Sequence, residues 1–195
     1  MRAVRLKALA TELGGRCHGD DAVVSGVAID SRRVSPGDLF VALPGARVDG
    51  HAYVAAAIDN GAAAAMVTEW VDSNLPQWRV DDAQRWLIEL ACWARAQINA
   101  PVIGVTGSNG KTTVKEMLNR ILATLGPTQA TRGNLNNELG VPVTLCQLSP
   151  DDRFAVIEMG CGQPGDIKLL SSWARPNIGV VNNAAAAHLA GFGSV

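Results

Sequence analysis

The 195-residue sequence predicts an α/β fold in two parts, with a small α/β domain over residues 1–82 and a parallel-sheet domain over residues 83–195. Three observations support this. Short apolar runs alternate with helical patterns, which is typical of parallel sheets that helices cover on both faces. Residues 72–76 read as a loop, and the composition changes around them. A glycine-rich segment at residues 104–113 stands between an apolar run and a helical pattern, as phosphate-binding loops do.

Each element of the first part has a local signal. Residues 6–13 place their leucines on one helical face, and Gly14 and Gly15 end that helix. Turn residues bound a short apolar run, and an alanine-rich helix ends at Gly61. The expected strands cover residues 22–29, 38–43 and 63–67, and the second helix covers residues 53–60.

The second part repeats a strand–helix rhythm. Asp81 and Asp82 can cap the helix that opens it, and Pro101 follows its end. The expected strands are residues 102–106, 154–159 and 178–182, and the expected helices are residues 83–98, 112–125, 141–148 and 166–173. In such sheets, ligands bind beyond the carboxyl ends of the strands.

Composition narrows the class of protein. Apolar residues make up 48% of the chain and charged residues 18%, which indicates a folded soluble protein. A net charge of −1 gives no general attraction to nucleic acid, so no nucleic-acid partner is expected. No apolar run approaches the ~20 residues that span a bilayer, and residues 1–7 lack the apolar core of a secretory signal. The four cysteines are scattered, which favours thiols in a reducing cytoplasm over a zinc site.

The segment at residues 104–113 is the strongest functional signal, because it places Gly-Lys-Thr at the start of a helix. Backbone N–H groups and the helix N-terminus then face an anion, Lys111 adds a positive charge, and the Thr112 hydroxyl is available to Mg²⁺. Val105 departs from the usual spacing, which has Gly or Ala there. The expected phosphate contacts are Gly107, Ser108, Asn109, Gly110, Lys111, Thr112 and Thr113.

Two further side chains follow strands at the same expected sheet edge. Glu158 ends the apolar run at residues 154–159, so its carboxylate should face the phosphate loop, where a magnesium ligand is needed. A solvated acid at a strand end is the alternative. His188 follows the third strand, although a lone histidine is more often structural.

Other polar residues carry weaker signals. Asn134, Asn136 and Asn137 crowd one loop, where asparagine also serves turns. In the first part, Ser31 and Arg32 follow a strand, and a hydroxyl with a guanidinium can hold a diphosphate. Surface caps and solvated charges use the same residue types.

Taken together, these strings resemble the Mur ligases, the ATP-dependent amide-forming enzymes of peptidoglycan precursor synthesis. The resemblance covers essentially the whole chain. It rests on residues 106–113, 133–137, 140–142, 158–160 and 182–194, and in the first part on residues 30–32 and 36–43.

The resemblance implies an N-terminal UDP-substrate domain, a P-loop ATP-binding domain and a cytoplasmic enzyme whose full-length form is a monomer. The most similar branch joins D-alanyl-D-alanine to UDP-N-acetylmuramoyl-tripeptide through an acyl phosphate, with ATP and Mg²⁺. By family position, Lys111 would act on the phosphates, and Thr112, Glu158 and His188 on magnesium. The substrate residues would be Asn134, Asn136 and Asn137 near ATP, with Ser31 and Arg32 at the UDP end.

Some family features are missing. Ala190 stands where glutamate is common and Ala184 where a larger apolar residue is common. The lysine that family enzymes carbamylate, the rest of the central sheet and the C-terminal domain would follow Val195. We therefore expect the front part of a larger enzyme, inactive alone. The alternatives are a sister ligase that adds diaminopimelate or lysine, a folylpolyglutamate synthase, against which the leading domain argues, and a non-catalytic nucleotide-binding module.

Overall fold

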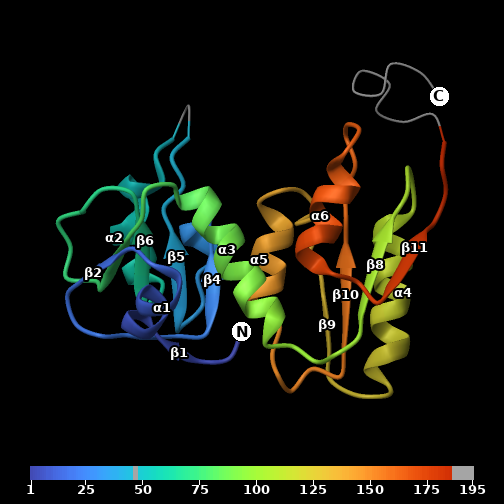
Figure 1. Ribbon diagram of the computed structural model, residues 1–195, viewed down its shortest axis with the longest axis horizontal. Helices are drawn as coiled ribbons and strands as arrows, with labels where there is room; N and C mark the ends of the chain where they lie inside the picture. The colour runs from blue at the N-terminus through green and yellow to red at the C-terminus, as the bar shows by residue number, and fades with distance from the viewer. Residues whose placement is uncertain (46–47, 186–195) are drawn as a thin grey trace. The chain divides into compact units, whose positions relative to one another are not determined.

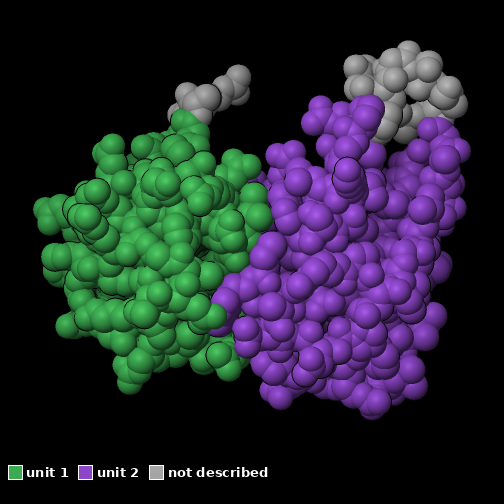
Figure 2. Space-filling view, in the orientation of Figure 1, with its two compact units in different colours: residues 1–90 green, residues 91–195 purple. Residues whose placement is uncertain are grey.

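A computed structural model describes residues 1–45 and 48–185 of the chain. The chain divides into two compact units, residues 1–90 and 91–195 (Figure 2). The division falls within helix α3 (Ala83–Ala96). A domain boundary at residue 82 stays a prediction. Across the described ranges, no helix is long and apolar enough to cross a membrane.

Unit 1 is built on a five-stranded sheet with the strand order β2-β7-β6-β5-β4 (Figure 1). Neighbouring strands pair in parallel, except that β2 and β7 are antiparallel. A separate antiparallel ribbon joins β1 (Val4–Arg5) to β3 (Val23–Val24). The strands of the larger sheet are β2 (Arg16–His18), β4 (Gly26–Ala28), β5 (Asp38–Val41), β6 (Ala64–Val67) and β7 (Gln77–Arg79).

Two helices cover apolar positions of unit 1. Helix α1 (Leu6–Leu13) buries Leu6 and Leu9, and it ends as predicted at Gly14, whose φ of 111° suits glycine. Helix α2 (Val54–Asp59) contributes to a cluster that includes Phe40 of β5. Two 3₁₀ turns, Ser31–Arg33 and Gly50–Tyr53, complete the unit.

The single strand predicted over residues 22–29 is wrong, because the chain changes partner at Ser25. Before it, β3 pairs with β1, and after it β4 pairs with β5. The Ser25 N–H donates instead to the carbonyl of Gly37, at 2.9 Å.

Unit 2 contains a four-stranded parallel sheet, which confirms the predicted fold class (Figure 1). Its order is β11-β8-β10-β9, and its strands are β8 (Val102–Thr106), β9 (Thr128–Ala130), β10 (Phe154–Glu158) and β11 (Ile178–Val181). The helices are α4 (Lys111–Ala123), α5 (Gly140–Cys146) and α6 (Asp166–Ala174), together with the end of α3.

The order of the strands creates a switch point between β8 and β10. The chain leaves β8 through α4 and returns at β9, on the far side of β10. It leaves β10 through α6 and returns at β11, in the opposite direction. Because such crossovers are right-handed, α4 and α6 lie on opposite faces, and a crevice opens at the strand carboxyl ends between β8 and β10.

Candidate functional site

The glycine-rich loop lies at this crevice, between the end of β8 at Thr106 and the start of α4 at Lys111. Val105 is a fully buried core residue of β8, so the loop itself begins after it. Gly107 and Gly110 have φ values of 138° and 74°, which disfavour other residues. A Cβ on Gly107 would lie 3.0 Å from the backbone of Asn183, which leaves it little room.

The segment after β11 holds the loop in shape. The Ser108 N–H donates to the Asn183 carbonyl at 3.1 Å, and the Asn109 N–H donates to the Asn183 side-chain oxygen at 3.0 Å. The Asn182 side-chain amide donates to the Asn109 carbonyl at 2.8 Å. The amides of Ser108 and Asn109 are therefore engaged by protein, and the donors at the start of α4 are the ones best placed for an anion.

Lys111 folds back over the loop that precedes it. Its ammonium donates to the Gly107 carbonyl at 2.6 Å, with the Ser108 carbonyl at 3.5 Å. The positive charge thus lies against the loop, where the sequence predicted it.

Glu158 is buried at the end of β10, with 1% of its surface exposed, so it is not a solvated strand-end acid. One carboxylate oxygen accepts a hydrogen bond from the Thr112 hydroxyl at 3.0 Å. The other accepts from the Asn136 side-chain amide at 2.8 Å. Its backbone N–H donates to the Thr131 hydroxyl at 2.9 Å. The structure therefore joins three sequence-predicted residues, Thr112, Asn136 and Glu158, in one cluster.

The three predicted asparagines have different environments. Asn136 also accepts, through its carbonyl, a 2.7 Å hydrogen bond from the Gly160 N–H. The Asn137 side chain accepts from the Gly140 N–H at 2.9 Å, at the start of α5, which is the turn role that asparagine often serves. Asn134 is exposed. His188 lies outside the described residues.

The cluster fits a magnesium ion that is bound together with a nucleotide. A threonine hydroxyl and a carboxylate are hard oxygen donors of the kind Mg²⁺ prefers. Within residues 1–45 and 48–185, no three His, Cys, Asp or Glu side chains form a group that could hold a metal. Mg²⁺ commonly takes one or two carboxylates along with phosphates and water, so an all-protein cage is not required.

A second predicted site lies in unit 1, where Ser31 and Arg32 line a hollow of about 660 Å³. Ser31 is buried, with 6% exposed. Arg32 is held by Asp30, whose carboxylate accepts from the guanidinium at 2.9 and 2.8 Å. This contact lowers the pKa of Asp30 to about 2. The other lining residues are Ile29, Asp30, Phe40, Leu43, Val48, Gly50, Tyr53 and Ala56.

Tyr53 is not among the predicted site residues, yet it lines this hollow with 41% of the residue exposed. Its neighbour His51 serves the fold. The His51 Nε2 atom accepts from the Thr68 N–H at 3.0 Å, which places the ring proton on Nδ1, 2.6 Å from Asp49. The sequence signal for Tyr53 was an aromatic residue at the start of the helix expected over residues 53–60.

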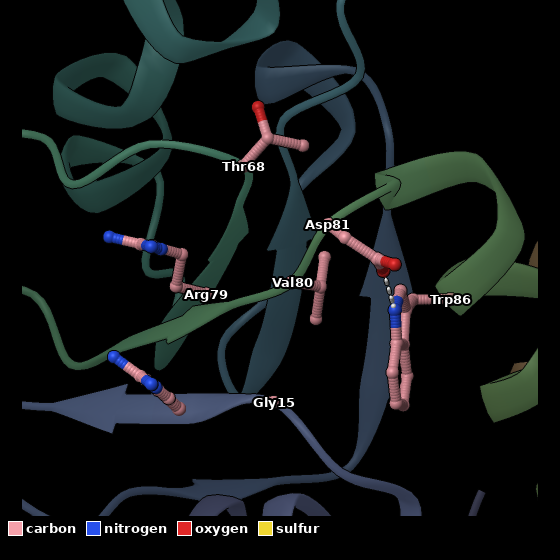
Figure 3. Close-up of a pocket in the computed structure, with 7 residues that line it drawn as sticks. Gly15, Thr68, Arg79, Val80, Asp81 and Trp86 are labelled. Carbon is pink, nitrogen blue, oxygen red and sulfur yellow. Dashed lines mark hydrogen bonds between the residues drawn. The ribbon is translucent and has the colours of Figure 1, made fainter.

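A separate hollow of about 410 Å³ opens at the β2–β7 edge of unit 1 (Figure 3). Arg16 and Arg79 are paired in register on the antiparallel strands β2 and β7, so their side chains leave the sheet on the same face. Asp81 accepts a 2.6 Å hydrogen bond from the Trp86 indole at the other side of the hollow. None of the sequence-predicted site residues lines this hollow.

The site has the features of a P-loop nucleotide-binding fold. A parallel strand leads through a glycine-rich loop into a helix that begins with Lys-Thr, and the neighbouring strand carries a buried acid. The family models are more specific. The Mur ligase family catalytic domain matches residues 23–93, and the Mur ligase middle domain matches residues 105–195. The chain belongs to the Mur ligase family, which confirms the resemblance.

Individual relatives point to one branch. The chain is 46% identical over its whole length to the UDP-N-acetylmuramoyl-tripeptide–D-alanyl-D-alanine ligase of Escherichia coli (strain K12), and covers 43% of that protein. It is 42% identical over 193 residues to the enzyme of that name from Haemophilus influenzae, and covers 42% of it. The chain therefore spans less than half the length of these curated relatives.

Two solved structures that resemble the chain belong to the same branch of the family. The chain is similar over its full length to MurF from Acinetobacter baumannii, with a TM-score of 0.86 and 37% identity, and covers 44% of that chain. It is also similar over 85% of its length to the MurF ligase from Thermotoga maritima in complex with ADP, with a TM-score of 0.70 and 35% identity, and covers 39% of that chain.

Proposed function

We propose that the full-length protein is an ATP-dependent ligase that joins D-alanyl-D-alanine to UDP-N-acetylmuramoyl-tripeptide. ATP phosphorylates the terminal carboxylate of the tripeptide, the amine of the dipeptide attacks the acyl phosphate, and ADP and phosphate are released. The names and identities of the relatives support this choice of substrates. The use of ATP is supported above all by the hydrogen bond between Thr112 of the phosphate loop and the buried Glu158.

The chemistry requires two anions to approach each other, so charge neutralisation and positioning carry the catalysis. Lys111 and the N-terminus of α4 would bind the transferring phosphates. Of the predicted loop contacts Gly107–Thr113, Ser108 and Asn109 would shape the loop more than bind the anion, because their N–H groups already donate to Asn183. Thr112, Glu158 and His188 would hold Mg²⁺, which would neutralise phosphate charge. Asn134, Asn136 and Asn137 would line the meeting point of ATP and the nucleotide-sugar substrate.

The hollow at Ser31 and Arg32 would receive the UDP end of the substrate. A buried serine, an exposed guanidinium and the Tyr53 ring offer a hydroxyl, a charge and an aromatic face. Arg32 would have to share its guanidinium between Asp30 and the diphosphate, because Asp30 already occupies two of its donors.

The remaining assignments complete the proposal. Residues 1–82 form the UDP-substrate domain, and residues 83–195 form the front part of the ATP-binding domain. The full-length enzyme works as a cytoplasmic monomer without nucleic acid and without insertion into the membrane. The chain on its own does not ligate.

The test is substrate-dependent release of ADP by the purified full-length protein. ADP release that requires both UDP-N-acetylmuramoyl-tripeptide and D-alanyl-D-alanine is the expected result. A requirement for the dipeptide precursor with diaminopimelate or lysine would assign the protein to the sister branch. Nucleotide binding without turnover on either substrate pair would indicate a non-catalytic module.

A further inference from the structure

Lys115 is a fully buried lysine in α4, with 0% of its surface exposed. Its ammonium donates to the Thr131 carbonyl at 2.8 Å and lies 2.7 Å from a carboxylate oxygen of Glu116, whose side chain is 50% exposed. Removing an ammonium from water is costly, and an apolar side chain of similar size is often at least as stable in such a position. A role in core packing alone therefore does not account for the charge.

The contacts of Lys115 lead to the phosphate site. Lys115 follows Thr112 by three residues, so the two occupy the same side of α4 on successive turns. Its partner Thr131 is 1% exposed, and the Thr131 N–H donates to the Val156 carbonyl of β10 at 3.0 Å. The Thr131 hydroxyl accepts from the Glu158 N–H at 2.9 Å.

These hydrogen bonds close a circuit. Lys115 binds Thr131, Thr131 binds the backbone of Glu158, and the Glu158 carboxylate binds Thr112 on the helix that carries Lys115. The side chain of Asn136, from the loop that follows Thr131, binds the second carboxylate oxygen. The circuit fixes Thr131 from both sides, and with it the position from which Glu158 reaches the phosphate loop.

We propose that Lys115 is a positioning residue for the nucleotide site. By holding Thr131, it fixes the Glu158 carboxylate against Thr112 and so sets the affinity for a nucleotide bound with Mg²⁺. This inference rests on the proposed function only for the assignment of phosphate and magnesium to this crevice. The amide-forming half of the reaction does not enter it.

The test compares nucleotide binding with and without magnesium. A fluorescent ADP analogue is titrated into the full-length protein and its Lys115→Met variant, once with Mg²⁺ and once with EDTA. The gain in affinity that Mg²⁺ gives should fall about 10-fold or more in the variant, the usual size of an effect from a residue that orients a metal ligand. In EDTA, the variant should bind the ADP analogue with the affinity of the wild-type protein, because it retains Lys111 and the phosphate loop.

Variants of Thr131 separate positioning from folding. Thr131→Val removes the hydroxyl that accepts the hydrogen bond from the Glu158 N–H, so it should lose the magnesium-dependent gain in affinity as Lys115→Met does. Thr131→Ser keeps the hydroxyl and should keep that gain. Lys168→Met, at an exposed lysine of α6, is the control and should change neither affinity. If Lys115→Met does not fold, the comparison of Thr131→Val with Thr131→Ser tests the proposal by itself. Equal magnesium-dependent gains in the two variants would contradict it.

Two results would overturn the proposal. One is a Lys115→Met protein that melts at a lower temperature but keeps the full magnesium-dependent gain. The other is an equal loss of affinity in Mg²⁺ and in EDTA, which would mean general damage to the loop. An unmodified protein that binds ADP with Mg²⁺ but does not ligate would refute the proposed function and leave this inference standing.

Discussion

The two predicted sites differ in how firmly the fold holds their charged groups. In unit 2, Glu158 is 1% exposed and hydrogen-bonded through both carboxylate oxygens and its backbone. In unit 1, the Arg32 side chain is 85% exposed and is held by a carboxylate two residues away. The buried cluster joins α4, β10 and the segment after β9, whereas the contacts that hold Arg32 in the described ranges come from Asp30 in its own turn.

This difference matches what each site would do. Phosphoryl transfer gains from donors and charges that are in place before the reaction, because they need no reorganisation in the transition state. A site that binds the UDP end of a large substrate, far from the reacting carboxylate, must be open to solvent, and its side chains need not be rigid. We therefore expect changes in unit 2 to lower turnover, and changes in unit 1 to weaken substrate binding with little effect on turnover.

The largest effect should come from Lys111→Ala in the full-length enzyme. In the proposed site this change removes a preorganised positive charge at the transferring phosphate, so turnover should fall by at least about 100-fold. Steady-state ADP release measures it. A loss smaller than about threefold would contradict the assignment of Lys111 as the phosphate lysine.

Glu158→Gln should come next. Glutamine has nearly the same shape and keeps an oxygen for Thr112, but it removes the negative charge. If Glu158 is a magnesium ligand as proposed, the change should raise the Mg²⁺ concentration at half-maximal rate by about 10- to 100-fold. An unchanged magnesium dependence of the rate would show that Glu158 serves the fold alone.

Tyr53→Ala tests the other side of the comparison. If the ring stacks on the base of the UDP substrate, its loss removes about 1–3 kcal/mol of binding, so KM for that substrate should rise about 10-fold while kcat stays unchanged. Trp70→Ala is the matched control, since Trp70 is 42% exposed in the same unit but does not line the hollow. Equal effects of the two changes would argue against a base-binding role.

The smallest effect concerns stability. Arg16 and Arg79 are directly opposed on β2 and β7, and like charges in that position destabilise a strand pair. Arg16→Glu should create an opposite-charge pair and raise the free energy of unfolding by about 0.2–1 kcal/mol. Urea denaturation measures the change, and turnover should stay the same. A weaker affinity for the UDP substrate would instead place these arginines in its binding site.

Long elements with clear apolar periodicity could be predicted from the sequence. The strand at residues 102–106 has the bounds predicted for it, and helix α1 ends at the predicted glycine. The short strands β2, β7 and β9 could not be predicted, because three residues are too few to establish an alternation of apolar and polar side chains. Their pairing depends on neighbours distant in the sequence.

The candidate site also contains residues that the sequence predicts and residues that only the structure reveals. The position of Glu158 followed from the meeting of strand carboxyl ends at one sheet edge. Lys115 could not be found, because a lysine four residues into a helix has the sequence pattern of a solvent-facing residue. Only the packing of α4 against β9 and β10 shows that it is buried beside Thr131. Asn182 and Asn183 belong to a segment that carries the family resemblance, but their structural role could not be predicted, because they bind a loop more than 70 residues earlier in the chain.

The transfer of oxygen from substrate to phosphate tests the central claim most directly. The full-length enzyme would be given UDP-N-acetylmuramoyl-tripeptide with ¹⁸O in its terminal carboxylate, together with ATP and D-alanyl-D-alanine. If the carboxylate attacks the γ-phosphate and the amine then displaces phosphate, one ¹⁸O atom should appear in each phosphate released, as measured by mass spectrometry. Phosphate that carries no ¹⁸O would show that no acyl phosphate forms, and would contradict the account.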